Sequence, residues 1–128
     1  MEKRIQYKQI TSLDSDWVRS QIGKFMAEDI PDGDVTTEAT VSGSIFVVTK
    51  MVAVDKFIFC GESIIPYCFP EPCLVDVKKK DGEWVQPGNT LAIITGPAGP
   101  ILTYERVTLN LIQRLCGIST ETKKYCDL

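Results

Sequence analysis

Histidine is absent from the 128-residue sequence, and its absence limits the chemistry that the chain can perform. Imidazole titrates nearest neutral pH and is the usual base beside a nucleophilic serine or cysteine. The chain therefore has no Ser-His or Cys-His dyad. We predict no catalytic residue within it and expect it to contribute binding or orientation to any reaction.

Two other kinds of signal are missing. No apolar run is long enough to span a bilayer, and the N-terminal segment lacks the apolar stretch and cleavage site of a signal peptide. The net charge of -3 gives no overall basic surplus that would favour phosphate contacts. We therefore expect a cytoplasmic protein that binds neither membrane nor nucleic acid.

Cysteines are present, but they are odd in number and irregularly spaced. In a chain without a secretory signal we expect reduced, mostly buried thiols. A zinc site would need a second close cysteine pair or histidines beside Cys68 and Cys73, so we predict no metal site in this chain. The five cysteines are Cys60, Cys68, Cys73, Cys116 and Cys126.

Composition fits one globular domain, with 44% hydrophobic and 24% charged residues. Helical spacing of apolar residues predicts a helix over residues 14–28. Strands are expected at 43–54, 74–78 and 90–95, where β-branched residues are frequent. Tight turns are expected at two glycine positions, Asp81-Gly82 and Pro87-Gly88.

The remaining segments predict two more helices. Residues 57–69 are mostly apolar and are followed by prolines, so we expect a short buried helix there. The strongest helical pattern covers residues 103–116, after a break at 96–100, and Gly117 is expected to end it. This order predicts an α+β fold, an open-faced α/β sandwich with helices covering a mostly antiparallel sheet.

A hairpin pattern at residues 81–91 also occurs in biotinyl and lipoyl carrier domains. Those domains present a modified lysine soon after it, whereas residues 92–100 contain no lysine. The carrier interpretation is therefore disfavoured, and two turns flanking strands explain the pattern.

Four carboxylates occur within residues 28–34, namely Glu28, Asp29, Asp32 and Asp34. Oxygen donors of this kind can bind a divalent cation. Their spacing is not that of a calcium loop, and the closing glutamate is missing. A turn after the first helix is the preferred interpretation.

Arg106, Asn110 and Gln113 are spaced i, i+4, i+7 and predict a polar stripe on the last helix. An arginine in the first helical turn would lie where the helix dipole favours anions. An anionic ligand there would gain from both the dipole and the forked guanidinium donors. A solvated surface arginine is the alternative.

The pattern E-R-x-x-L-N followed by L-x-G-I-x-T-x-T lies in residues 105–122. With Ala27–Thr37, Cys60-Gly-Glu62 and Asp81-Gly82, it resembles the N-terminal half of the quinolinate phosphoribosyltransferase family. The resemblance covers nearly all of residues 14–126. Cys116 and Ser119 depart from the family's usual serine and alanine.

The resemblance implies an enzyme of NAD biosynthesis that converts quinolinate and phosphoribosyl pyrophosphate to nicotinate mononucleotide, pyrophosphate and carbon dioxide. It also implies a homodimer in which this sandwich covers the partner's α/β barrel. Arg106 would be the substrate-binding residue, since a planar dicarboxylate favours bidentate arginine. The family's Mg²⁺ is bound by the barrel, outside this chain.

We therefore assign residues 1–13 to a polar lead-in, 14–116 to the N-terminal sandwich domain and 117–128 to the start of the absent barrel. The chain is expected to be inactive alone. The alternative is a non-catalytic interaction module derived from the same domain, with apolar surface left uncovered around the last helix.

Overall fold

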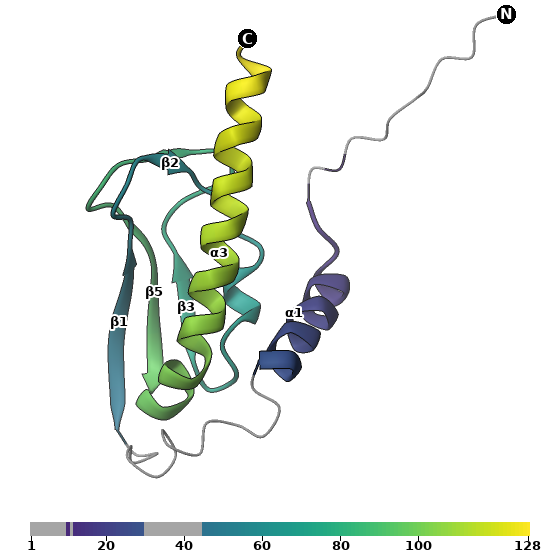
Figure 1. Ribbon diagram of the computed structural model, residues 1–128. Helices are drawn as coiled ribbons and strands as arrows, with labels where there is room; N and C mark the ends of the chain where they lie inside the picture. The colour runs from purple at the N-terminus through teal and green to yellow at the C-terminus, as the bar shows by residue number, and fades with distance from the viewer. Residues whose placement is uncertain (1–9, 11, 30–44) are drawn as a thin grey trace, which may run out of the picture.

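The structure is a computed structural model that describes residues 10, 12–29 and 45–128. Two long helices and five strands follow one another along these residues (Figure 1). The elements are α1 (Ser15–Asp29), β1 (Phe46–Val52), β2 (Phe57–Ile58), the 3-10 helix η1 (Ile65–Tyr67), β3 (Leu74–Val77), β4 (Trp84–Val85), β5 (Thr90–Pro97) and α3 (Ala98–Cys126).

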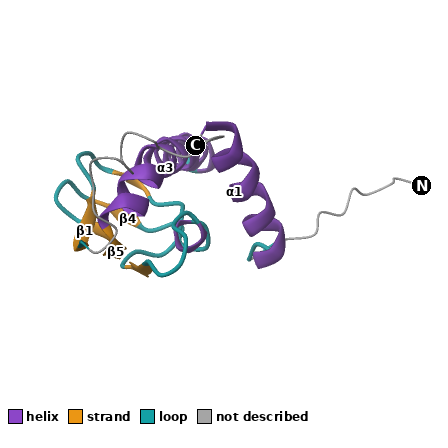
Figure 2. Ribbon diagram, turned by 90° about the horizontal axis from the view of Figure 1, so that it is seen from below, coloured by secondary structure: helices purple, strands orange, loops and turns teal. Residues whose placement is uncertain are grey.

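The main sheet has β5 at its centre, with β1 and β3 antiparallel to it on either side. β2 and β4 form a separate antiparallel ladder of two residue pairs. Figure 1 shows α3 running along the sheet, and Figure 2 shows α1 set to one side of it. The expected α+β fold, an open-faced sandwich with an antiparallel sheet, is confirmed.

Alternation along the strands explains why only one face of the sheet is covered. Met51 pairs with Ala92, and both are buried on the face toward α3. Val48 and Leu74 point to the other face and are 67% and 72% exposed. Successive side chains of a strand point to opposite faces, so a single layer of helix leaves the second face open.

One core joins the layers. Helical spacing places the buried residues of α3 and α1 on the faces that meet the sheet and η1. Most members of the core are aliphatic or aromatic. The central members are Val18, Ile22, Met26, Met51, Phe59, Ile65, Val85, Leu91, Ala92, Ile94, Ile101, Val107, Ile112 and Cys116.

Several local predictions are confirmed. The helix expected over 14–28 is α1, and the three strands lie within or close to their expected ranges as β1, β3 and β5. The two expected turn glycines have positive φ, +87° at Gly82 and +91° at Gly88. The acidic segment predicted to turn continues past Asp29 into residues 30–34, which lie outside the described residues.

The helix predicted over residues 57–69 is wrong. The segment begins as β2, turns at Gly61 and has only the three-residue η1. The carbonyl of Gly61 accepts hydrogen bonds from the N–H groups of Ile64 and Ile65 at 3.0 and 2.9 Å. Phe59 N–H instead donates to Glu83, so pairing with the β4 region overrides the helical option.

The predicted limits of the last helix are also wrong. Residues 96–100 do not break regular structure, because β5 runs to Pro97 and α3 begins at Ala98. Pro100 lies in the first turn, where its missing N–H costs no helical bond. Beyond Gly117, the backbone N–H of Ile58 donates to the Thr120 hydroxyl at 3.0 Å, which bonds this part of α3 to β2.

No helix in the described ranges 12–29 and 45–128 is long and apolar enough to cross a membrane.

A substitution can test whether α3 continues through Gly117. A Cβ added at Gly117 would meet no atom within 4 Å, and its φ is not positive. Gly117→Ala should therefore raise the free energy of unfolding by about 1 kcal/mol, since alanine favours helix interiors. Chemical denaturation of the chain measures this change.

The matched control is Gly82→Ala, at a position with φ of +87°. This substitution should lower the free energy of unfolding by about 1–2 kcal/mol, because L-residues disfavour the left-handed region. A destabilising Gly117→Ala would instead mean that the helix ends there.

Candidate functional site

The polar stripe predicted on the last helix lies on the solvent side of α3. Arg106, Asn110 and Gln113 are all exposed. Val107 and Thr108 beside them are buried and hold the helix against the core. The stripe therefore projects from a fixed element, which is what orientation of a ligand requires.

Arg106 takes part in no ion pair with a described residue, since the ion pairs in this part of the chain all use lysine. Its neighbour Glu105 is adjacent in sequence, and i, i+1 side chains on a helix do not face each other. The five guanidinium donors are therefore not engaged by a carboxylate of these residues. A fork of this geometry can bind one carboxylate through two parallel hydrogen bonds.

The expected contribution of the helix dipole at Arg106 is wrong. That expectation placed Arg106 in the first turn, whereas α3 begins eight residues earlier at Ala98. At a rise of about 1.5 Å per residue, the helix N-terminus is about 12 Å away. Dipole effects fall off within the first turn, so anion binding at Arg106 depends on the guanidinium itself.

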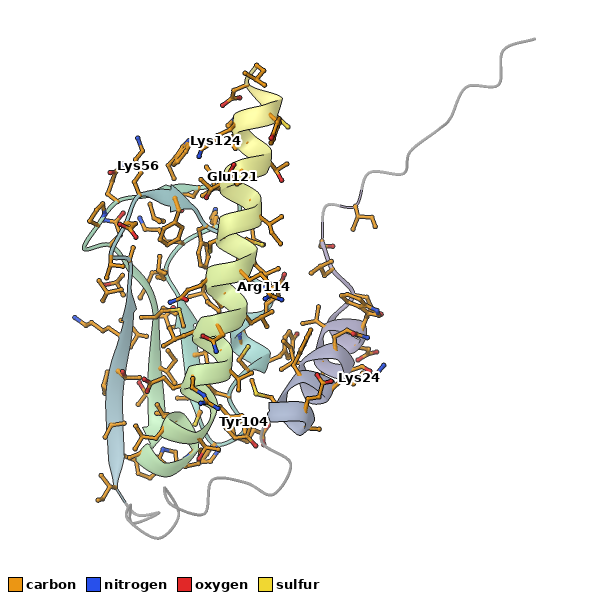
Figure 3. All side chains as sticks on the ribbon, in the orientation of Figure 1. Lys24, Lys56, Tyr104, Arg114, Glu121 and Lys124 are labelled. Carbon is orange, nitrogen blue, oxygen red and sulfur yellow. The ribbon has the colours of Figure 1, made fainter. Side chains whose placement is uncertain are left out.

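Next to the stripe is a groove of about 540 Å³, between α3 and the segment 53–57 that follows β1. Gln113 and Gly117 line its α3 side, and Asp55 and Lys56 line the other. The Lys56 ammonium lies 5.1 Å from the centroid of the Trp84 ring. In Figure 3, Lys56 lies at the same end of the molecule as Glu121 and Lys124.

Sequence reasoning missed this groove. Its outer wall is the junction between β1 and β2, which fell between a predicted strand and a predicted helix. Gly117, on the α3 side of the groove, is a position where the sequence predicts the end of a helix. Arg106 is not among the lining residues, so the structure brings only Gln113 of the stripe to the groove.

The Cys60-Gly-Glu62 and Asp81-Gly82 motifs are joined by one carboxylate. Asp81 Oδ1 accepts hydrogen bonds from the backbone N–H groups of Gly61 and Glu62, at 2.7 and 2.9 Å. Both motifs therefore have a structural role, because together they hold the turn after β2 to the turn before β4.

The cysteines are all free thiols, as predicted, but fewer are buried than expected. Cys68 and Cys116 are buried, two others are half-buried and Cys126 is exposed. Burial raises the pKa of the Cys68 thiol to about 11. It also raises the pKa of Cys60 and Cys116. At neutral pH these thiols are protonated and are weak nucleophiles.

The described residues hold no group of three or more acidic, cysteine or histidine side chains that could bind a metal ion. Mg²⁺ needs several oxygen ligands in octahedral geometry. These residues do not fit a Mg²⁺ site, so we derive no step through the metal here.

The Asp81 interaction predicts a clear loss of stability on truncation. Asp81→Ala leaves the N–H groups of Gly61 and Glu62 without their acceptor, and we expect the free energy of unfolding to fall by about 1–3 kcal/mol. Urea denaturation measures the change.

The control is Asp76→Ala, which removes an exposed ion pair with Lys78 and should change stability by less than about 1 kcal/mol. Equal effects of the two substitutions would contradict the structural role of Asp81.

Comparison with known proteins gives consistent matches. Residues 34–116 match the family described as "Quinolinate phosphoribosyl transferase, N-terminal domain". A Bacillus subtilis (strain 168) protein named "Probable nicotinate-nucleotide pyrophosphorylase", carboxylating, is 37% identical over 110 residues, covering 84% of this chain and 38% of the relative. The carboxylating nicotinate-nucleotide pyrophosphorylase of Mycobacterium leprae (strain TN) is 30% identical, covering 92% of this chain and 44% of the relative.

A solved structure has the same fold. The nicotinate-nucleotide pyrophosphorylase from Francisella tularensis superimposes with a TM-score of 0.84 at 26% identity, covering 93% of this chain and 43% of that protein. The chain thus spans less than half the length of these relatives.

Proposed function

Because this chain belongs to the family of quinolinate phosphoribosyltransferase N-terminal domains, we propose that it is the substrate-capping and dimerisation domain of such an enzyme. The enzyme converts quinolinate and phosphoribosyl pyrophosphate to nicotinate mononucleotide, pyrophosphate and carbon dioxide in NAD biosynthesis. It acts in the cytoplasm, in keeping with five free cysteines. The chain alone does not catalyse this reaction.

The exposed guanidinium of Arg106 on α3 is the observation that carries this proposal. Quinolinate has two neighbouring carboxylates on a planar ring, and a guanidinium can bind one of them through both of its oxygens. The buried neighbours Val107 and Thr108 fix the backbone of α3 beneath Arg106. The backbone that carries the side chain therefore needs no reordering when it meets a ligand presented by another surface, and only the arginine side chain has to be ordered.

The residues that the chain contains indicate which part of the reaction this domain supports and which part belongs to the barrel domain. With no histidine in the sequence, and with burial raising the pKa of the Cys60, Cys68 and Cys116 thiols, its contribution is to bind and orient the dicarboxylate and to exclude water from it. The Mg²⁺ that neutralises the pyrophosphate is held by the barrel domain. The groups that perform the transfer belong to that domain as well.

The open face of the sheet supports the dimerisation part of the proposal. Phe46, Val48 and Leu74 are 64%, 67% and 72% exposed on strands of one sheet. Exposed apolar surface of this kind favours association. A second candidate is a non-catalytic interaction module that binds a partner through apolar surface around α3, where Leu102, Ile118 and Tyr125 are 49%, 59% and 74% exposed.

A chimeric enzyme tests the role of Arg106. The matching N-terminal part of the Mycobacterium leprae protein is replaced by this chain, and formation of nicotinate mononucleotide from quinolinate is measured. We expect the chimera to be active and Arg106→Lys to raise KM for quinolinate by about 10- to 100-fold, because a bidentate charged pair is lost. The isolated chain should show no turnover.

Arg114→Lys is the control, because Arg114 is also an exposed arginine of α3. It lies about 80° further around the helix from Arg106, and Figure 3 shows it on the side of α1. Its substitution should leave KM unchanged. An active chimera with an unaltered KM in Arg106→Lys would refute the binding of quinolinate by Arg106. Turnover by the isolated chain would refute its inactivity.

Association of the chain is tested separately by sedimentation velocity. We expect a concentration-dependent dimer that Val48→Lys together with Leu74→Lys disrupts, since both side chains lie on the open face. Lys50→Glu is a control for surface charge on the same strand. A chain that stays monomeric at all concentrations argues against dimerisation, while an inactive chimera with a stable dimer favours the non-catalytic module.

A further inference from the structure

The sulfur of Cys116 lies against the backbone of Cys60. The N–H of Cys60 donates to the Cys116 sulfur at 3.4 Å, and the Cys116 thiol donates to the Cys60 carbonyl at 3.5 Å. The two residues are 56 positions apart, one on α3 and the other just after β2. This contact brings two cysteines together that the sequence gives no reason to pair.

The two thiols differ in their access to solvent. Cys116 is buried, whereas Cys60 is half-buried and lines a surface hollow of about 380 Å³. Ser119 and Cys126 line the same hollow. Cys116 also lines the groove of about 540 Å³ described above, but it is only 4% exposed, so a small reagent from solvent meets the more exposed Cys60 thiol first.

We propose that Cys60 and Cys116 form a modification site, a thiol pair that a hydroperoxide converts to a disulfide. Hydrogen peroxide oxidises the Cys60 thiol to a sulfenic acid and releases one water. The Cys116 thiol then attacks the sulfenic sulfur, forming the S–S bond and releasing a second water. The two thiols together lose two electrons to hydrogen peroxide, which is the oxidant and is reduced to water.

The Cys116 sulfur lies 3.4 and 3.5 Å from the backbone N and O atoms of Cys60. A disulfide requires Cα atoms about 4.4–6.8 Å apart. Because the Cys116 sulfur already touches both the N and the O atoms of Cys60, closure needs mainly a rotation of the Cys60 side chain. Burial raises the pKa of both thiols, so the reaction is slower than at an exposed low-pKa sensor cysteine.

Cys126 is the competing partner, because it lines the same hollow as Cys60. It lies ten residues beyond Cys116, about 15 Å further along the helix axis. The contact with the backbone of Cys60 belongs to Cys116. The first disulfide therefore forms between residues 60 and 116, and it ties the turn after β2 to the middle of α3.

Peptide mapping tests the pairing. The folded chain is treated with hydrogen peroxide, alkylated without reduction and digested with trypsin. Cys116 and Cys126 then fall in different peptides, 115–123 and 125–128, and Cys60 falls in 57–78. We expect 57–78 linked to 115–123, with a mass loss of two hydrogens that dithiothreitol reverses.

Variants identify the cysteine within the shared peptide. Cys60→Ser should abolish the link, whereas Cys73→Ser, in the same peptide, should preserve it. Oxidised chain should also unfold at a midpoint at least about 5 °C higher than reduced chain. A link to 125–128, a link that survives Cys60→Ser, or Cys60 oxidised to a sulfinic acid without any link would each overturn the proposal.

Discussion

The close approach of the Gly61 backbone to the middle of α3 is the constraint on which the rest of the structure depends. A Cβ at this position would lie 2.9 Å from Ile112 Cδ1, so any larger residue would force the end of the Ile112 side chain to move. Asp81 holds the same turn through two backbone hydrogen bonds. Together they fix the β2–η1 segment on α3, and with it the buried side chains that orient the helix above the sheet. The contact between Cys60 and Cys116 is a direct result of this approach.

From this packing follows the division of α3 into two faces. The inner face, with Ile101, Ile112 and Cys116, belongs to the core. The outer face has Arg106 and Asn110 and contributes nothing to the packing of the described residues. Polar side chains that a domain does not need for its own stability are the ones available for a ligand or a partner. The proposed role of Arg106 therefore costs the fold little, whereas the motifs at residues 60–62 and 81–82 are needed to build it.

Sequence reasoning predicted the features that depend on local chemistry. Apolar spacing identified α1, β-branched residues identified the strands, and the positive φ of Gly82 and Gly88 was signalled by their turn context. Sequence reasoning failed where contacts between distant segments determine the local structure. Residues 57–69 are apolar enough for a helix, but they pair with β4 and turn at Gly61 instead. The exposure of Arg106 followed from its spacing, while the groove beside Gln113 did not, because its walls come from segments that are far apart in sequence.

β5 passes into α3 without a loop, since Pro97 is the last residue of the strand and Ala98 the first of the helix. Any change in the register of the central strand would therefore also rotate the helix about its axis. A slip of β5 by one residue would exchange its two faces, and the same shift would turn the side chains of α3 by about 100° around the helix axis. Hydrogen bonding of β5 to two neighbouring strands excludes this slip. The direction in which the Arg106 guanidinium points thus depends on the register with which β5 pairs with β1 and β3.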